Sequence, residues 1–432
     1  MLKFSNIRVM KNLLTAENFR WTAVFLIGMA NFFLPIAINL NGLFLTIAAI
    51  FVFLQIRGVK VFRNFLNPCF LGCLLLFGMY AISCLWSENI DFAKDSLSRK
   101  ALIILFPLAF FLLHEITGKH LKLIVSLFTL SNIIVLTVSL IDSGINSYQQ
   151  HDLNLITHNH LSDFFGLQAT YLALYLMTNM ALLAVLATYG YFTNRIFLTL
   201  ILVFFSAGIL LTGARSMYVA LLLFMLIYLI RSGLKEKKLR GKHVLIGVGI
   251  LFFASLVIYK IKPLKERIHE ATRTDLSLLE MKHFEHDTPF NGVTLRLLFW
   301  KFGWEILQEQ KAFVGGVGIG DAQDLLEQKF YQYHVYTGNP AYNDTGYLHY
   351  NYHNQFVQMT MHIGLTGLLI LLILLGVTAR KIAQNSDWLM AGIVCAFVIL
   401  FIVESALERQ FGLSHIFFWL PLLYRVKLKN PA

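Results

Sequence analysis

The sequence predicts an all-α polytopic membrane protein with about twelve transmembrane helices and one large outer loop containing short amphipathic helices. Of its 432 residues, 57% are hydrophobic and only 14% are charged, whereas soluble domains are about 45–50% apolar and about 25% charged. The apolar residues also fall in runs near the length that crosses a hydrocarbon core of about 30 Å. Together these observations exclude most soluble enzymes, disordered chains and fibrous proteins.

The apolar runs show no strand-like alternation, so helices are the structures that would satisfy their own backbone groups in lipid. A turn at 39–42 makes the first pair the least certain, because these runs form either two spans or a re-entrant hairpin. The predicted spans are 20–37, 40–56, 66–86, 100–114, 121–141, 163–188, 195–212, 214–230, 243–260, 354–378, 388–404 and 411–425.

The distribution of basic residues predicts the orientation of these spans. With a cytoplasmic N-terminus, the inner segments hold 21 of the 36 Lys and Arg residues but only four of the 24 acidic residues. This asymmetry follows the positive-inside rule and places both termini in the cytoplasm. The net charge of +12 therefore reflects topology, and we reject nucleic acid as a partner.

The chain has no internal repeat, so we expect residues 1–432 to form a single transmembrane domain. A large outer loop, 261–353, lies between spans nine and ten. Within it, 295–310 carries apolar residues at helical spacing and predicts an amphipathic helix along the outer membrane boundary. The four cysteines all lie inside apolar runs, which indicates small core residues rather than a disulfide framework.

Two arginines on the outer side are candidates for binding an anion. Arg215 lies in a tight turn between two apolar spans, where a cation is costly unless it is paired or reaches the interface. Arg296 opens the amphipathic segment, and its guanidinium suits phosphate oxygens bidentately. The alternatives are an interfacial arginine for Arg215 and an ordinary surface arginine for Arg296.

His353 lies at the mouth of span ten and is a candidate proton acceptor near neutral pH. Asn354, directly after it, is a candidate for orienting a sugar hydroxyl. His349 and His353 have a metal-ligand spacing, but no nearby carboxylate completes the set, so no metal is expected. A histidine without a catalytic role at the end of a loop is the alternative.

Three further residues are supporting candidates. Glu404 ends span eleven on the outer side and either belongs to a boundary charge cluster or pairs with Arg215, Arg296 or His353. His160 precedes span six, in a segment that either caps a helix or binds a hydroxyl group. Arg99 begins span four and either adds positive potential for an anionic head group or ends a helix.

The glycine-rich segment at 315–320 suggests a nucleotide site at first sight. It lacks the preceding strand and the Lys-Ser/Thr pair of such sites, so a flexible turn after the amphipathic helix is the better interpretation. The tyrosine-rich stretch at 331–352 either stacks on sugar rings or lies in an interfacial aromatic belt.

Several short motifs, all on the predicted outer side, resemble the O-antigen ligase and polymerase superfamily of membrane glycan ligases. In order along the chain they are TGARSM at 212–217, RLLFW at 296–300, GGVGIG at 315–320, HNQF at 353–356 and GLTG at 364–367. The resemblance covers roughly 150–425, and the hydropathy pattern extends it across the chain.

The resemblance implies a membrane-embedded glycosyltransferase that uses a polyprenyl-diphosphate-linked glycan, without cofactor or metal. It implies that the large loop is periplasmic and that the protein lies in the bacterial inner membrane. The two arginines of the ligase pattern map onto Arg215 and Arg296, which would bind the donor diphosphate, and its histidine maps onto His353. The expected acceptor is lipid A-core, or a second lipid-linked glycan in the polymerase branch.

We favour the ligase because polymerases often carry two comparable outer loops, and here the loop 142–162 is short. An O-antigen or exopolysaccharide repeat-unit polymerase of the same fold is the main alternative. A lipid or solute transporter is a third interpretation, but its spans should carry charges near mid-membrane, and the predicted spans hold almost none.

Overall fold

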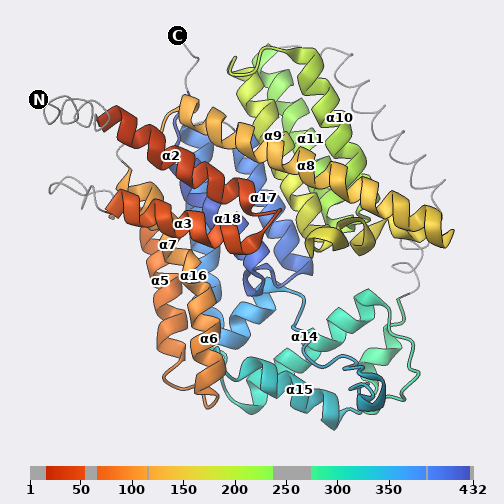
Figure 1. Ribbon diagram of the computed structural model, residues 1–432. Coiled ribbons are helices and arrows are strands. Elements are labelled where there is room, and N and C mark those ends of the chain that lie inside the picture. Colours follow the sequence, from red (N-terminus) through yellow and green to blue (C-terminus); the bar gives the residue numbers. More distant parts are fainter. Residues whose placement is uncertain (1–15, 54–65, 114–115, 237–273, 386–387, 429–432) are drawn as a thin grey trace, which may run out of the picture.

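Figure 1 shows the computed structural model, which describes residues 16–53, 66–113, 116–236, 274–385 and 388–428. These residues form helices and loops, with two isolated β-bridges and no strand among them. The helices are α2 (Ala16–Phe33), α3 (Ile38–Phe53), α5 (Pro68–Ser83), α6 (Ile90–Lys100), α7 (Leu102–Leu112), α8 (Gly118–Gln150), α9 (Ala169–Thr188), α10 (Arg195–Leu211), α11 (Arg215–Glu236), α14 (Gly292–Glu309), α15 (Ala322–Gln332), α16 (Gln355–Asn385), α17 (Trp388–Val403) and α18 (Gln410–Arg425).

Every predicted span except one coincides with a helix of the structure. The exception, 243–260, lies outside the described residues, as does the first part of the predicted loop 261–353. Among the described residues, three helices are long and apolar enough to cross a membrane: α8, α9 and α16. The all-α class is thus confirmed, whereas the count of about twelve spans stays a prediction.

Side-chain caps explain where several of these helices begin. The Asn67 side chain accepts from Phe70 N ahead of Pro68, and Thr117 forms a capping box with His120 at the start of α8. Such caps satisfy the backbone N–H groups that a first helical turn leaves without an intrahelical partner. The helix starts are therefore encoded locally.

One end of the bundle, called here the far end, is defined by contacts between helix termini. At the end of α18, Arg425 donates to the carbonyl oxygens of Phe111 in the last turn of α7 and of Leu113 just after it. The last residue of α16, Asn385, donates to Tyr424 O at 3.4 Å. Helices α7, α16 and α18 therefore all end at the far end, where α8 begins beside the residues that follow α9.

The opposite end, called here the α14 end, gathers the other termini of the same helices. Asn354, just before α16, donates to Ile402 O near the end of α17 at 3.1 Å. Lys100, just before α7, donates to Leu407 O at 2.5 Å. Tyr171 in the first turn of α9 packs beside Gly412 of α18. The α14 end lies at the bottom of Figure 1.

Helix α11 also begins at the α14 end. Helix α10 runs antiparallel to α9, because Ser206 contacts Met180 while Gly208 packs against Leu176. Helix α10 therefore finishes level with the start of α9, and α11 follows after three residues. From there α11 packs along α17, with Phe224 beside Gly392.

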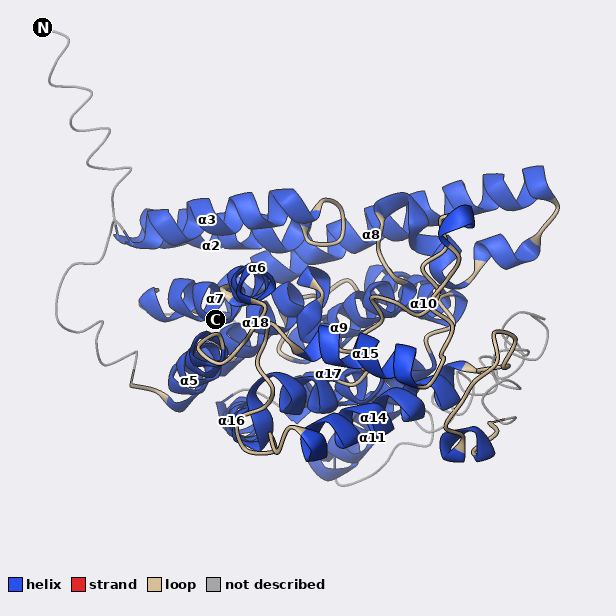
Figure 2. Cartoon of the chain, turned by 90° about the horizontal axis from the view of Figure 1, so that it is seen from below, coloured by secondary structure: helices blue, strands red, loops and turns tan. Residues whose placement is uncertain are grey.

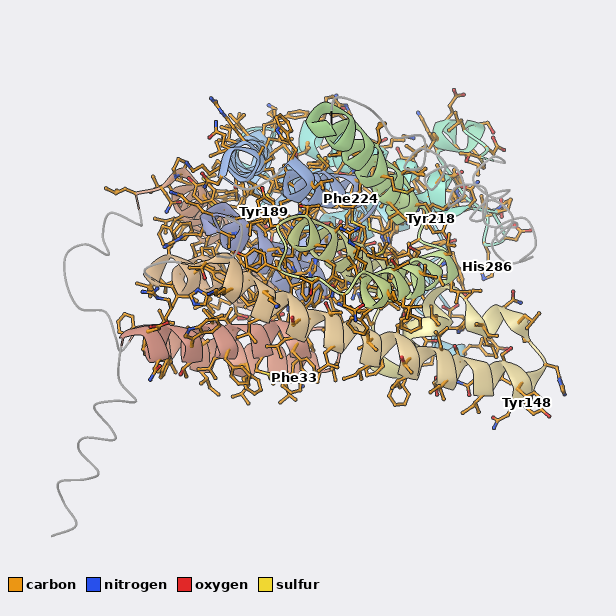
Figure 3. All side chains as sticks on the ribbon, turned by 90° about the horizontal axis from the view of Figure 1, so that it is seen from above. Phe33, Tyr148, Tyr189, Tyr218, Phe224 and His286 are labelled. Carbon is orange, nitrogen blue, oxygen red and sulfur yellow. The ribbon has the colours of Figure 1, made fainter. Side chains whose placement is uncertain are left out.

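Large apolar side chains cover much of the outside of the bundle. Helices α2, α3 and α8 form one layer, with Phe33 and Tyr148 on it, and Phe224 of α11 lies toward the opposite face (Figures 2 and 3). On the outward side of α10, Ile196 is 77% exposed and Leu200 is 63% exposed. Surfaces of this kind suit a hydrocarbon environment rather than water.

The first two helices form an antiparallel hairpin whose tip stops against the middle of α8. Phe19 stacks on Phe51 near the open end of the hairpin. At the tip, Asn41 donates to Ala30 O at 2.7 Å, and Ser131 of α8 donates to Phe32 O at 2.5 Å. Ser131 is the midpoint of the predicted span 121–141. Side chains thus satisfy the carbonyls freed at the tip, as a turn inside hydrocarbon requires.

We expect this hairpin to be re-entrant, so that its tip does not reach the outer aqueous phase. In a cysteine-free background, Asn39→Cys should resist an impermeant maleimide added from outside, although Asn39 is exposed on the protein. Asn154→Cys, exposed after α8 at the α14 end, is the matched positive control. Equal labelling of the two sites would mean that α2 and α3 are full spans.

The described part of the large loop folds into a compact subdomain with its own hydrophobic cluster. Helix α14 contributes Leu298, Phe302 and Ile306, and α15 contributes Leu326 and Phe330. The predicted amphipathic helix 295–310 thus corresponds to α14, whose apolar face packs on this cluster. Its predicted place along the membrane boundary stays a prediction.

The glycine-rich segment after α14 is not a flexible turn, because it docks into a break in α16. At the break, Gly364 has φ +69°, and a Cβ there would lie 2.0 Å from Val314 O. Val317 N donates to Met361 O and Leu365 N donates to Phe313 O, each at 2.8 Å. The segment therefore satisfies backbone groups of α16 that the kink exposes.

A second link ties the subdomain to the bundle. Asp321, just before α15, accepts from the backbone N–H groups of Glu88 and Asn89, each at 2.9 Å. Gly320 N donates to Ser87 Oγ at 3.1 Å. The loop between α5 and α6 thus holds the start of α15, and the α14 end becomes one connected surface.

Candidate active site

The backbone around His353 is held in an uncommon conformation by its neighbours. His353 has φ +45°, in the left-handed region that non-glycine residues rarely adopt. Its own N–H donates to Asn351 Oδ1 at 2.9 Å. Immediately afterwards, Asn354 caps α16 by accepting from Phe356 N and Val357 N. Strained backbone of this kind clusters at functional sites.

The structure places His353 against Glu404. The distance from His353 Nδ1 to Glu404 Oε2 is 3.5 Å, and the two side chains are 25% and 11% exposed. His353 is one of the partners that the sequence left open for Glu404, and the two side chains are in contact. At this distance the contact is electrostatic rather than a well-formed hydrogen bond. A carboxylate on Nδ1 favours the tautomer whose Nε2 accepts a proton.

Arg296 lies on the face of α14 that meets the residue before His353. Trp300, one turn later, donates from Nε1 to Tyr352 O at 2.9 Å. A Cβ on Gly303 would touch the Tyr352 ring at 3.1 Å. Residues 296, 300 and 303 share one helix face. Arg296 is partly buried. It lies about 6 Å along the helix axis from the Tyr352 contact. Its Nη1 donates to Gly292 O at 2.7 Å.

Arg215 is the first residue of α11, and a short turn fixes its place. Thr212 donates to Ile209 O at 2.6 Å, and Gly213 has φ +64°. Tyr218 then closes the turn by donating to Leu210 O at 2.6 Å. Because α11 begins at the α14 end and packs along α17, Arg215 and Glu404 lie at the same end of the bundle.

The other supporting candidates pair locally. His160 Nδ1 lies 3.2 Å from Asp163 Oδ2 within the 3-10 helix His158–Phe165. Its neighbour Asn159 accepts from Ala169 N at the start of α9, which is a capping role. Arg99 pairs with the exposed Asp95 in α6, which ends one residue later. Their predicted contributions to the site stay predictions.

Sequence reasoning missed a buried charged cluster beside this site. Lys100 is 2% exposed, and its Nζ lies 2.6 Å from Glu408 Oε1. His362 Nδ1 lies 3.7 Å from the same oxygen. Burial opposes ionisation of Glu408, but the charge and the hydrogen bond of Lys100 outweigh burial and hold the pKa of Glu408 below the ordinary value. The Glu408 side chain is only 17% exposed, so its charge depends on Lys100 for compensation.

A signal for part of this cluster was present in the sequence. Asn354, Gln358 and His362 recur every four residues, which places them on one face of a helix. Polar residues inside a span mark sites of function or of partner contact. Lys100 and Glu408 lie too far apart in sequence for any local pattern to pair them.

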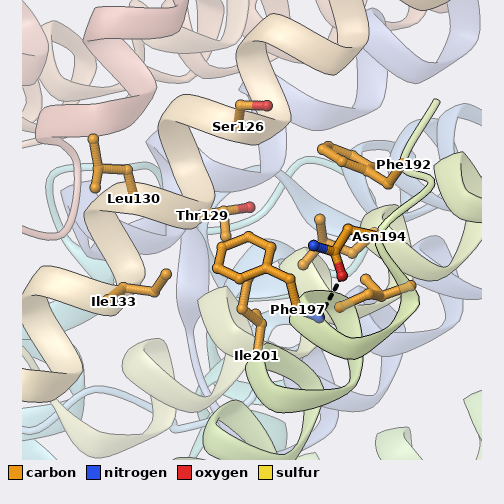
Figure 4. Close-up of a pocket in the computed structure, with 10 residues that line it drawn as sticks. Ser126, Thr129, Leu130, Ile133, Phe192, Asn194, Phe197 and Ile201 are labelled. Carbon is orange, nitrogen blue, oxygen red and sulfur yellow. Dashed lines mark hydrogen bonds between the residues drawn. The ribbon is translucent and has the colours of Figure 1, made fainter.

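A cavity elsewhere in the bundle lacks the chemistry of this site. It holds about 180 Å³ between α8 and α10 near the far end, lined by Ile133, Phe197 and Ile201 among others (Figure 4). Two of its polar residues are already engaged: Asn194 accepts from Phe197 N, and Thr129 donates to Val125 O. No acid or base lines it. The candidate active site therefore lies at the α14 end.

The fold and this site define a helical membrane protein with acid, base and cationic groups collected at one end. Residues 200–372 match the model of the O-antigen ligase family, which confirms the resemblance to the O-antigen ligase superfamily. The match contains Arg215, Arg296 and His353 and ends before Glu404. It indicates a membrane glycosyltransferase of the ligase or polymerase type. No curated protein matches the chain.

Proposed function

We propose that this protein is an O-antigen ligase that moves a glycan from a polyprenyl-diphosphate carrier to lipid A-core. The observation that carries the proposal is the contact between His353 and Glu404 at the α14 end. Of the two residues, His353 lies in the strained turn before α16. Arg296 on the adjoining helix face and Arg215 at the same end supply the cations that a diphosphate requires.

In the proposed reaction, the acceptor hydroxyl oxygen attacks the anomeric carbon of the donor glycan. The bond from that carbon to the diphosphate oxygen breaks, and its electron pair leaves with the diphosphate. Arg215 and Arg296 stabilise the developing charge, which is usually the largest single contribution to catalysis. His353 Nε2 takes the hydroxyl proton while Glu404 holds the imidazole in that tautomer.

This chemistry needs no nucleotide, because the activated diphosphate bond already carries the required free energy. It fits a protein of the bacterial inner membrane with both termini in the cytoplasm and the α14 end facing the periplasm. Lipid-linked glycan and lipid A-core would then meet at the outer face of the membrane, and apolar surface between helices would hold the polyprenyl chain.

A deletion strain distinguishes the ligase from its alternatives. We expect long polymer to accumulate on the polyprenyl carrier while lipid A-core stays bare, when the two lipid fractions are separated on one gel. The wild-type gene supplied in trans should restore glycan to lipid A-core.

Two other patterns would contradict the ligase. Lipid A-core capped by a single repeat would identify a repeat-unit polymerase. Unchanged glycans on both lipids would exclude a glycosyltransferase function and favour a transporter.

A further inference from the structure

The backbone N–H groups of Tyr352 and Asn354, the residues on either side of His353, are held by one side chain and its hydroxyl partner. Gln358, one turn into α16, accepts from Tyr352 N at 3.3 Å through its Oε1. The same oxygen accepts from Ser405 Oγ at 3.4 Å. That hydroxyl in turn accepts from Asn354 N at 3.2 Å. All four of these groups are buried, so water does not offer replacement partners.

Gln358 can make these contacts in only one orientation of its own side-chain amide. Its Oε1 must face Tyr352 and Ser405, so its Nε2 must donate in the opposite direction. There it meets His362 Nε2 at 2.9 Å. Since an amide N–H₂ only donates, His362 must accept at Nε2 and carry its proton on Nδ1.

The buried ion pair selects that same tautomer of His362. His362 Nδ1 faces Glu408 Oε1, which the ammonium of Lys100 keeps as a carboxylate. A carboxylate beside Nδ1 favours the Nδ1–H form and leaves Nε2 as the acceptor. At 3.7 Å the contact of His362 Nδ1 with Glu408 is electrostatic rather than a hydrogen bond, and it favours the same tautomer that the hydrogen bond from Gln358 requires.

We propose that Gln358 is a positioning residue for the transfer reaction, oriented by His362 and fixing the turn that aims His353. The proposal rests on the proposed function, because its consequence is the geometry of His353 toward the acceptor. It goes beyond the roles of the arginines, His353 and Glu404, because Gln358 and His362 touch neither reactant and act through the backbone.

The test measures transfer from undecaprenyl-diphosphate-linked glycan, extracted from the deletion strain, to lipid A-core of that strain. We expect Gln358→Leu to lower kcat by about 10- to 100-fold, since small misplacements of a reacting group cost this much. The donor KM should stay within about twofold, because the donor binds elsewhere. Gln410→Leu, an exposed position at the start of α18, is the matched control.

Conservative variants separate positioning from simple structural damage. His362→Gln should stay within about threefold of wild type, because its amide accepts from Gln358 and donates toward Glu408 as the required tautomer does. His362→Leu should lose kcat as Gln358→Leu does. Equal losses in His362→Gln and His362→Leu would overturn the orienting role of His362.

Ser405→Ala decides the matter if Gln358→Leu fails to accumulate, because it removes one hydroxyl with little change of volume. We expect kcat to fall about tenfold with KM unchanged. A wild-type kcat in Gln358→Leu would overturn the proposal. If Gln358→Leu does not accumulate, a wild-type kcat in Ser405→Ala would overturn it. His353→Ala in the same assay separates the levels: wild-type activity there refutes the role of His353 as base, and loss there with normal Gln358 and Ser405 variants refutes only the positioning. Absence of transfer by the wild-type protein would refute the proposed function.

Discussion

Replacing His353 with alanine is expected to lower glycan transfer by at least about 100-fold, because a positioned general base typically contributes 10²–10⁴-fold. Arg215→Ala and Arg296→Ala should each cost about 100- to 1,000-fold, the usual effect of losing one donor to a developing charge. Arg296→Lys should recover little, since an ammonium cannot bind two phosphate oxygens in a planar fork. The measurement is transfer to lipid A-core, normalised to the amount of each variant in the membrane.

Arg195→Ala is the matched control for Arg215. Both arginines begin a helix, but Arg195 begins α10 and Arg215 begins α11, so they lie at opposite ends of the bundle. The control should keep normal transfer. Full activity in His353→Ala would refute its role as base, and full activity in both Arg215→Ala and Arg296→Ala would refute the diphosphate clamp.

Replacing Lys100 with methionine should be the most destabilising of the single substitutions considered for this chain. It leaves the Glu408 carboxylate buried without its ammonium partner, and breaking a buried ion pair in this way costs about 3–5 kcal/mol. Thermal unfolding of the purified protein in detergent measures the effect.

Its neighbour provides the control. Arg99→Met removes a charge paired with exposed Asp95, and such surface pairs contribute about 0–1 kcal/mol. The double variant Lys100→Met with Glu408→Gln should regain part of the loss, because no uncompensated charge then stays buried. Equal stability of Lys100→Met and Arg99→Met would contradict the role assigned to this ion pair.

Most helices of the bundle were predictable from sequence because each corresponds to its own apolar run, and side-chain caps mark where some of them begin. The run 121–141, for example, lies within α8, which begins at the Thr117 cap. The catalytic candidates were equally visible, since Arg215 and His353 are polar residues at the borders of apolar runs. The family motifs drew attention to them independently of any geometry.

The buried ion pair was hidden because it depends on a contact between distant segments. Lys100 and Glu408 are 308 positions apart, and only the packing of α7 beside α18 brings them together. The break in α16 was equally unpredictable, since Gly364 looks like any glycine in an apolar helix until the segment at 313–317 is seen against it. Tertiary hydrogen bonds, rather than local propensity, decide such features.

The docking of the glycine-rich segment into the break of α16 has a consequence for protein engineering. The two strips of backbone, 313–317 and 361–366, interlock through mutual hydrogen bonds and the absence of side chains at Gly316 and Gly364. A chimera that grafts the loop subdomain from another enzyme must therefore transplant both strips as one cassette. Exchanging either alone would leave mismatched backbone at the junction.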